Sequence, residues 1–400
     1  MQRPLIRAMS ILVLGIISAP AWADTTLREA LDKAWERAVQ ARVAESRRAE
    51  ADASRTVANS WFPEPPSIGL SEKSGRFDSN RGAREREIEL ALPLWLPGQR
   101  AAREAFAARD AADAEAALAA ARLALAGELR SAVWSLAAAK SEVDIAAERL
   151  ATAETLEADV MRRQKAGDLA RTDLLLAQEE TLAAKAALAE VRTRERQALG
   201  RLRVLTGLDS MPSAIEEAEP PATAGSHPRL AFAQAAVERA RADVQVTRED
   251  RRNPPELFIG VAQTRDDFSV PSYNSVRLGI RVPFGTEARN APKLAVTNST
   301  LIKAEAELRQ TMAEIETEQS AAQAALGNAQ AAYQATQLRA ALADERLSLQ
   351  KKAFSLGELG LSEFMRIRAA ANESRLELLR AQYALGAARA QLNQAKGILP

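Results

Sequence analysis

The sequence predicts a mainly α-helical fold, in which long coiled-coil helical hairpins carry a small β part of four strands. The first observation behind this is composition: the chain is rich in Ala, Leu, Glu and Arg, and aromatic residues make up only 4%. Such a composition is typical of long helices that pack along narrow seams. The second observation is that one order of elements occurs twice. The third is that each copy holds two short stretches of alternating apolar and polar residues, as strands do.

The N-terminus has the pattern of an export signal. Arg3 and Arg7 precede an apolar run over residues 11–20, and Ala-Trp-Ala at 21–23 fits a cleavage site between small residues. We therefore expect residues 1–23 to be a signal peptide, and the mature chain to begin at Asp24 and leave the cytoplasm.

Charge and composition argue against several functional classes. The 54 Lys and Arg residues are balanced by 53 Asp and Glu residues, so nothing in the charge favours a nucleic-acid partner. There is no cysteine, hence no disulfide framework and no site for a lipid anchor after the signal. One histidine and scattered methionines provide no metal-ligand spacing. We expect no cofactor, no metal site and no nucleic-acid partner.

Two copies of one plan divide the mature chain. Prolines and glycines recur in register, together with Ala and Leu positions of the helices between them: Pro93 with Pro283, Gly167 with Gly357, Gly207 with Gly397. Such matches are more specific than the similarity of two Ala-rich helices. We predict a first repeat over 24–207, a Pro- and Ala-rich linker over 208–226, and a second repeat over 227–400.

Each repeat is expected to begin with a helix, over 25–58 and 227–250, which a Pro-rich break ends because proline lacks the backbone donor. A β-hairpin follows, over 67–94 and 256–283. A long helix of about 65 residues, roughly 100 Å at 1.5 Å per residue, then runs to a glycine corner, and a return helix closes the repeat. The long helix carries an apolar stripe close to a heptad seam: Leu118, Leu125, Leu129, Val133, Leu136.

The predicted strands alternate strictly. One face of the first repeat's second strand is apolar at Ile88, Leu90 and Leu92, while the other face has Glu85, Glu87, Glu89 and Ala91. In the second repeat Val276, Leu278 and Ile280 alternate with Arg and Gly. Strands of eight to ten residues with this pattern are what a membrane barrel with a wet lumen requires, and we expect these six residues to face lipid. A soluble hairpin on a helical core is the alternative.

The number of strands implies an oligomer. A spanning sheet must close to leave no unpaired edge in lipid, and known barrels of this type begin at about eight strands. Four strands per chain therefore require several chains to share one barrel. The count alone allows eight, twelve or sixteen strands.

The signal peptide, the duplicated helix–hairpin–long-helix units and the two glycine corners together resemble the TolC-type outer-membrane efflux family. The corner sequences "GDLARTDL" (167–174) and "GELGLSEF" (357–364) and the "HPRLAFAQAAVERARADV" opening of the second repeat are similar to its patterns. The resemblance implies a homotrimer in the outer membrane of a Gram-negative bacterium. Twelve strands would form a barrel in outer-membrane lipid, continued by an α-helical tunnel through the periplasm.

The resemblance also implies partners and a site. The corners would form the periplasmic entrance and dock a periplasmic membrane-fusion adaptor, which links the channel to an inner-membrane pump, most simply of RND type. Gly167 and Gly357 would let the chain reverse where a side chain would clash. The adaptor-docking candidates at the entrance are these residues: Gly167, Leu169, Thr172, Asp173, Gly357, Leu359, Ser362, Glu363. Asp173 and Glu363 have a second interpretation as caps of the return helices.

Departures from the family pattern are informative. The family's better-known channels carry a second acid three residues after the position of Glu363, but this chain has Arg366 there. A doubled acidic ring is therefore in doubt, and Glu363 with Arg366 is the candidate gate. The segment "ERAVQARVAE" replaces a break usual in the first helix, so this helix is expected to enter differently. The turn "ALPLWLPGQR" and the stretch "SVRLGIRVPFGTEARN" are most similar to the heavy-metal (CzcC-like) branch.

The predicted function is that of a passive exit duct from periplasm to exterior, with heavy-metal cations as the expected cargo. Drug efflux and type I protein secretion remain alternatives within the same fold. A soluble periplasmic coiled-coil scaffold or adaptor is a further alternative, distinguished by whether the strands face lipid. An enzyme is not expected, because no nucleophile motif, phosphate loop or metal-ligand spacing occurs, and His227 is placed to cap a helix.

Overall fold

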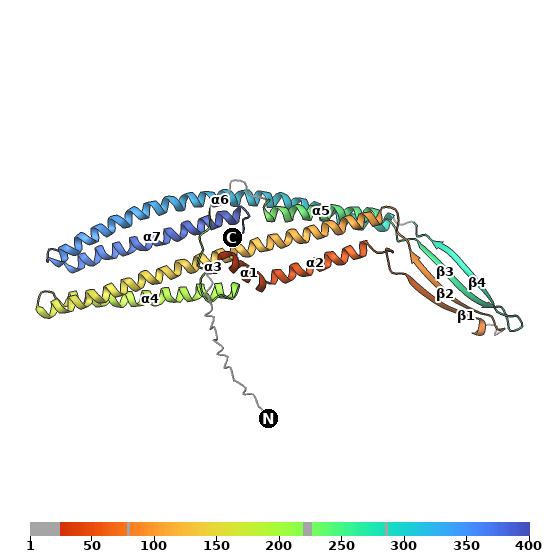
Figure 1. The fold of residues 1–400 in the computed structure, drawn as a ribbon, viewed down its shortest axis with the longest axis horizontal. Coiled ribbons are helices and arrows are strands. Elements are labelled where there is room, and N and C mark those ends of the chain that lie inside the picture. The colour runs from red at the N-terminus through yellow and green to blue at the C-terminus, as the bar shows by residue number, and fades with distance from the viewer. Residues whose placement is uncertain (1–24, 78–80, 219–225, 285–286) are drawn as a thin grey trace, which may run out of the picture.

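The chain folds into long helices with a small sheet at one end, as Figure 1 shows. The computed structural model describes residues 25–77, 81–218, 226–284 and 287–400. The predicted signal peptide therefore lies outside the described residues, as does part of the predicted linker, 219–225.

Two very long helices run most of the length of the molecule. Helix α3 (Gln99–Ala166) has 68 residues and α6 (Glu287–Ser355) has 69. Each is followed by a return helix, α4 (Arg171–Thr206) and α7 (Leu361–Ala395), which packs back against it. The resulting two hairpins end together at the left of Figure 1.

Three shorter helices fill the other half of the bundle. Helices α1 (Leu27–Arg37) and α2 (Val39–Ala58) lie along α3, and α5 (Pro228–Glu249) packs between α3 and α6. The single helix expected over 25–58 is broken at Ala38, whose extended backbone (ψ 135°) ends α1 and begins α2. The break lets α1 insert its apolar side chains between α3 and α4, while α2 continues along α3 towards the sheet.

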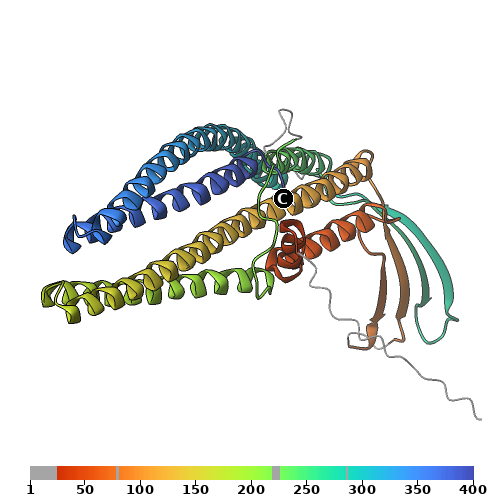
Figure 2. The ribbon, with the colours of Figure 1, turned by 60° about the vertical axis from the view of Figure 1, so that its left-hand side comes forward.

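The sheet is antiparallel and contains both hairpins. Its strands are β1 (Ser67–Ser74), β2 (Arg84–Pro93), β3 (Glu256–Arg265) and β4 (Tyr273–Arg281), in the spatial order β1-β2-β3-β4. A short 3-10 helix (Gly75–Phe77) follows β1. The two hairpins join where β2 pairs with β3. Figure 2 shows the sheet as a curved layer that extends from the ends of the helices.

The main core lies midway along the helices and is built from small and aliphatic side chains. Leu31 of α1, Leu129 of α3 and Leu202 of α4 are at most 1% exposed. Of the five residues in the predicted heptad seam, Leu125, Leu129, Val133 and Leu136 belong to this core and Leu118 does not. Buried alanines complete this core: Ala30, Ala34, Ala126, Ala198.

A buried ion pair holds the segment around Glu217 against the core. Arg130 of α3 binds Glu217 with an N–O distance of 2.6 Å, and both side chains are almost fully buried. Arg130 also donates to the backbone oxygen of Ile398 at 2.9 Å, and Asn393 donates to Glu217 at 3.0 Å. One arginine therefore joins helix α3, the segment around Glu217 and the C-terminal residues.

Candidate functional site

The two glycine corners lie at the same end of the molecule and have the same backbone geometry. Gly167 and Gly357 have φ of 89° and 79°, in the left-handed region. The N–H of the residue after each glycine bonds back into the last helical turn, from Asp168 to Arg163 at 2.9 Å and from Glu358 to Ala353 at 3.0 Å. These bonds satisfy carbonyls that would otherwise be unpaired at the helix ends.

The clash that glycine avoids at the corners is with the adjoining backbone and not with a packed neighbour. A Cβ built on Gly167 or Gly357 would meet no atom beyond the adjacent residues within 4 Å. What requires glycine is the positive φ, which L-residues with a Cβ adopt only at a cost. Both corners are consequently open to solvent.

The two acidic residues after the corners behave differently. Asp173 caps α4, because its Oδ2 accepts from the backbone N–H of Ala170 at 3.1 Å. Glu363, at the equivalent place in α7, instead accepts two hydrogen bonds from Arg366, at 2.6 and 2.9 Å. This guanidinium holds the pKa of the Glu363 carboxyl below its usual range. The two candidate gate residues therefore form a pair with each other.

An apolar cluster joins the two hairpins just behind the corners. Its buried members come from all four long helices: Val160, Ala177, Phe354, Leu361, Phe364. Phe354 and Phe364 stack with ring centroids 4.7 Å apart. Leu169 and Leu359 pack against the cluster, whereas Thr172 and Ser362 are exposed. Of the docking candidates, Leu169 and Leu359 are thus partly buried against the cluster, whereas the side chains of Thr172 and Ser362 are accessible to solvent.

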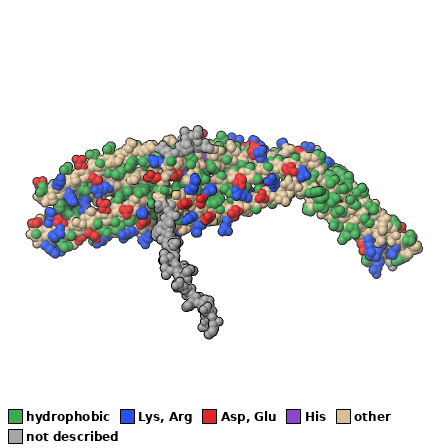
Figure 3. Space-filling view, viewed as in Figure 1, with side chains coloured by type: hydrophobic (Ala, Val, Ile, Leu, Met, Phe, Trp, Pro, Cys, Tyr) green, Lys and Arg blue, Asp and Glu red, His purple; other side chains and the backbone are tan. Residues whose placement is uncertain are grey.

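The strand register aligns the apolar side chains in rows. Residues directly opposite each other in an antiparallel pair share a face. Leu90 pairs with Ile259, which pairs with Leu278, and the rows on either side are equally apolar: Ile88, Val261 and Val276; Leu92, Leu257 and Ile280. Leu278 is 69% exposed. Figure 3 shows the hydrophobic side chains gathered over the sheet end of the molecule.

The opposite face of the sheet carries ion pairs that cross strand β3. Arg277 of β4 reaches Glu87 of β2 with an N–O distance of 2.7 Å. Gly260 of β3 lies beneath this pair, and a Cβ there would be 3.1 Å from the Glu87 carboxylate. Arg281 of β4 likewise reaches Glu89 of β2 at 3.9 Å, and it also pairs with Glu256 of the adjacent strand β3 at 2.6 Å. The sheet is therefore apolar on one side and charged on the other.

The only histidine serves a structural role. His227 is the N-cap of α5, and its Nδ1 accepts from the backbone N–H of Arg229 at 3.2 Å. Burial lowers the pKa of this imidazole, which favours the neutral form that can accept the bond. This agrees with the capping role expected from the sequence.

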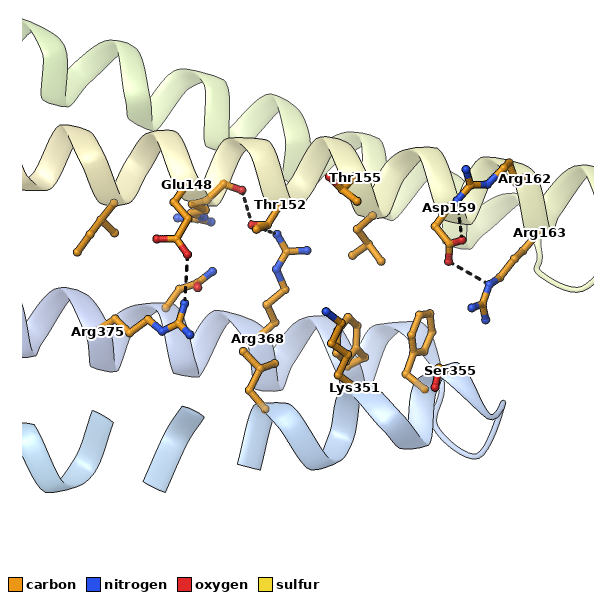
Figure 4. A pocket seen from close by; sticks show the side chains of 17 residues that line it. Glu148, Thr152, Thr155, Asp159, Arg162, Arg163, Lys351, Ser355, Arg368 and Arg375 are labelled. Carbon is orange, nitrogen blue, oxygen red and sulfur yellow. Dashed lines mark hydrogen bonds and ion pairs between the residues drawn. The ribbon is translucent and has the colours of Figure 1, made fainter. Parts of the chain in front are cut away.

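A cavity near the corners was not predicted from the sequence. It has a volume of about 560 Å³ and lies between α3 on one side and α6 and α7 on the other, as Figure 4 shows. Arg368 of α7 points across it and donates to Thr152 of α3 at 2.7 Å. Neither residue belongs to a recognisable motif. Only the packing of the two hairpins brings them together.

Comparisons with known proteins agree with this architecture. Residues 30–208 match the model of a family described as outer membrane efflux protein. The structure is similar to that of CusC, whose crystal structures are described in terms of transmembrane channel formation. The TM-score between the two is 0.78 at 18% sequence identity, over 94% of this chain and 93% of that one. VceC from Vibrio cholerae gives 0.71 at 16%, over 93% and 96%. The CmeC outer membrane channel of Campylobacter jejuni gives 0.70 at 14%, over 99% and 94%.

At these identities the likeness establishes the fold: the chain has the TolC-like fold of these channels over nearly its whole length. No curated protein matches the chain by sequence. In the described residues there is no helix long and apolar enough to cross a membrane. The same residues contain no group of three or more His, Cys, Asp or Glu side chains placed to hold a metal ion.

Proposed function

We propose that this chain is the outer-membrane channel of a tripartite efflux system, a passive exit duct from the periplasm to the exterior. The observation that carries the proposal is the sheet, with an exposed apolar face and a charged opposite face at one end of long helical hairpins. This is the arrangement needed where one face meets lipid and the other meets water. The family match over 30–208 and the shared fold support it. The sheet lies in outer-membrane lipid and the helices extend into the periplasm.

The channel is a homotrimer in this proposal. In the described chain β1 and β4 are the two outer strands of the sheet, each with one partner strand. An open edge in lipid leaves backbone groups unpaired, so the edges must pair with other copies. Three copies would supply twelve strands, and their helical hairpins would continue the barrel as a tunnel.

The corners are the proposed docking site for a periplasmic membrane-fusion adaptor, which connects the channel to an inner-membrane pump. Their backbone symmetry supports this, because two similar corners per chain would give six near-equivalent positions in a trimer. Thr172 and Ser362 are the exposed contacts, and Leu169 and Leu359 provide the apolar edge. The Glu363–Arg366 pair is the proposed gate, since it lies in the first turns of α7, directly after the corner.

Heavy-metal cations are the proposed cargo, on the resemblance of two sequence stretches to the heavy-metal branch. Drug efflux and type I secretion use the same fold and remain the second candidates. A strain that lacks the gene distinguishes them when it is challenged with cobalt, zinc and cadmium salts and, separately, with antibiotics. Sensitivity to metals alone supports the first candidate, and sensitivity to antibiotics alone rejects it.

The channel itself is tested by the native mass of the protein extracted from the outer-membrane fraction in a nonionic detergent. A species of three chains is the expected result. A monomer in the soluble periplasmic fraction would reject the channel, because the strands would then not meet lipid. The coiled-coil scaffold would replace it.

A further inference from the structure

The cavity between the hairpins, called here the corner cavity, is strongly basic. It is lined by six basic side chains and two acidic ones: Arg149, Arg162, Arg163, Lys351, Arg368 and Arg375; Glu148 and Asp159. The acidic side chains already have partners. Asp159 lies 3.0 Å from Arg163 and 3.1 Å from Arg162, and Glu148 lies 3.7 Å from Arg375. Two further lining arginines pair with carboxylates outside the lining, Arg149 with Glu180 at 2.9 Å and Arg375 with Asp344 at 2.7 Å. Among the described residues, the positive charges of the cavity that no carboxylate pairs with are therefore those of Arg368 and Lys351.

Arg368 is the residue on which the inference rests. It is 7% exposed, and no carboxylate among the described residues lies within ion-pair distance of it. Within the described part of the chain, the one hydrogen bond of its side chain goes to the neutral hydroxyl of Thr152, which itself donates to the backbone oxygen of Arg149. Glu180 contributes a favourable charge but is bonded to Arg149 at 2.9 Å.

A buried guanidinium in this state needs an anion. Burial lowers the pKa of Arg368, yet an arginine stays protonated near neutral pH. Buried charges in folded proteins are normally paired, because removing a charge from water is costly. Arg368 has five N–H donors and uses one on Thr152, so donors remain for an oxyanion in the cavity.

The cavity also has an apolar wall. The stacked rings of Phe354 and Phe364 form part of the lining, together with Leu156 and Leu347. A volume of about 560 Å³ exceeds what a single inorganic oxyanion fills and lies within the range of small-molecule sites. The lining thus offers one buried cation for a charged group and an aromatic surface for the rest of a ligand.

We propose that the corner cavity binds a small organic carboxylate with an apolar body, whose carboxylate pairs with Arg368 and whose body packs on Phe354 and Phe364. Lys351, an exposed residue of the cavity lining, provides a second positive charge. These four residues all belong to the α6–α7 hairpin, and Thr152 of α3 contacts the site through its hydrogen bond with Arg368. The proposal does not depend on the function proposed above.

Calorimetric titration of the full-length assembled protein in nonionic detergent tests this, with benzoate as the probe. We expect one benzoate to bind per chain. Two control compounds should each bind at least about tenfold more weakly. Benzyl alcohol has the same ring without the charge, and inorganic phosphate has no apolar body. Absence of benzoate binding up to about 10 mM would overturn the proposal. The cavity would then be filled by another group, such as a carboxylate of a neighbouring copy.

Variants place the site. Arg368→Gln is expected to weaken benzoate binding at least about tenfold, because it removes the charge that the carboxylate needs. Arg380→Gln is the matched control: it removes the same charge from an exposed position of α7 outside the cavity, and binding should be unchanged. Equal binding by Arg368→Gln and the wild type would overturn the proposal.

A second variant guards against misfolding of Arg368→Gln. Lys351 is exposed, so Lys351→Gln is not expected to alter the fold. It should weaken benzoate binding about threefold, in the range of an exposed charge pair. Benzoate should also raise the unfolding temperature of the wild type and of Arg380→Gln, because a ligand that binds only the folded state stabilises it. Two results would count against the proposal. One is that Lys351→Gln binds benzoate as well as the wild type does, and the other is that benzoate does not raise the unfolding temperature of the wild type.

Discussion

Replacing Leu278 by arginine tests which face of the sheet meets lipid, and the preceding residue provides a matched control. Leu278 stands in the middle of three apolar rows, with Ile259 and Leu90 beside it. Arg277 points to the other face, where it pairs with Glu87. Leu278→Arg and Arg277→Gln therefore alter adjacent residues of one strand on opposite sides of the sheet.

The magnitude follows from the position of the row. Rows two residues apart are separated by about 6.8 Å along a strand, so the three rows span about 14 Å and Leu278 lies near their centre. An arginine at the midplane of a membrane sheet costs about 2–4 kcal/mol, or roughly 30- to 900-fold in the assembly equilibrium. Arg277→Gln loses only a half-exposed ion pair, which is worth at most about 1 kcal/mol.

The assay is the amount of trimer in the outer-membrane fraction, measured by native electrophoresis at equal expression. Leu278→Arg should lower it strongly, and Arg277→Gln should leave it close to the wild type. The opposite result, with Arg277→Gln unassembled and Leu278→Arg assembled, would reverse the facing of the sheet. Equal assembly of both variants would mean that neither face meets lipid.

The remaining predictions concern the corners, the histidine and the helix packing. Gly357→Val should assemble normally but abolish transport, because a β-branched residue at positive φ costs about 1–2 kcal/mol and distorts the corner. The control is Gly327→Val, at an equally open place without positive φ, which should transport normally. An active Gly357→Val channel would remove the corner from the mechanism. Burial lowers the pKa of His227. The contribution of this histidine to stability is therefore complete above the unfolded pKa of about 6.5 and is lost as the pH falls below that value. Between pH 7.5 and 5 the unfolding temperature of His227→Asn, whose cap does not titrate, should fall less than that of the wild type, and equal falls would refute this. Gly386→Ala should destabilise the protein by about 1–3 kcal/mol in chemical denaturation, because its Cβ would lie 2.1 Å from the Trp134 ring; an unchanged free energy of unfolding would show that the ring can move aside.

Local sequence signals predicted most of the elements. Strand alternation predicted the hairpins to within one or two residues, with β2 ending at Pro93 and β4 beginning at Tyr273. The corners were predicted because a glycine after a long helix is a local signal for its end. Such features depend on residues close together in the chain, so no knowledge of the packing is needed to recognise them.

The roles of the two corner acids, and one pairing between distant residues, were decided only by the structure. Asp173 and Glu363 occupy equivalent positions, and the sequence left capping and gating open for both. The structure assigns a cap to Asp173 and a partner, Arg366, to Glu363. The bond between Thr152 and Arg368 joins residues that are 216 positions apart.

The physical reason is that Ala-rich helices determine their own formation but not their relative register. Alanine is a good helix former and offers nearly the same surface on every side, so many alignments of two such helices bury similar areas. The faces that meet are chosen by the few larger side chains, among them the stacked pair Phe354 and Phe364. The sequence thus determined the helices, strands and corners, and the packing of the two hairpins alone determined that a buried arginine faces a cavity between them.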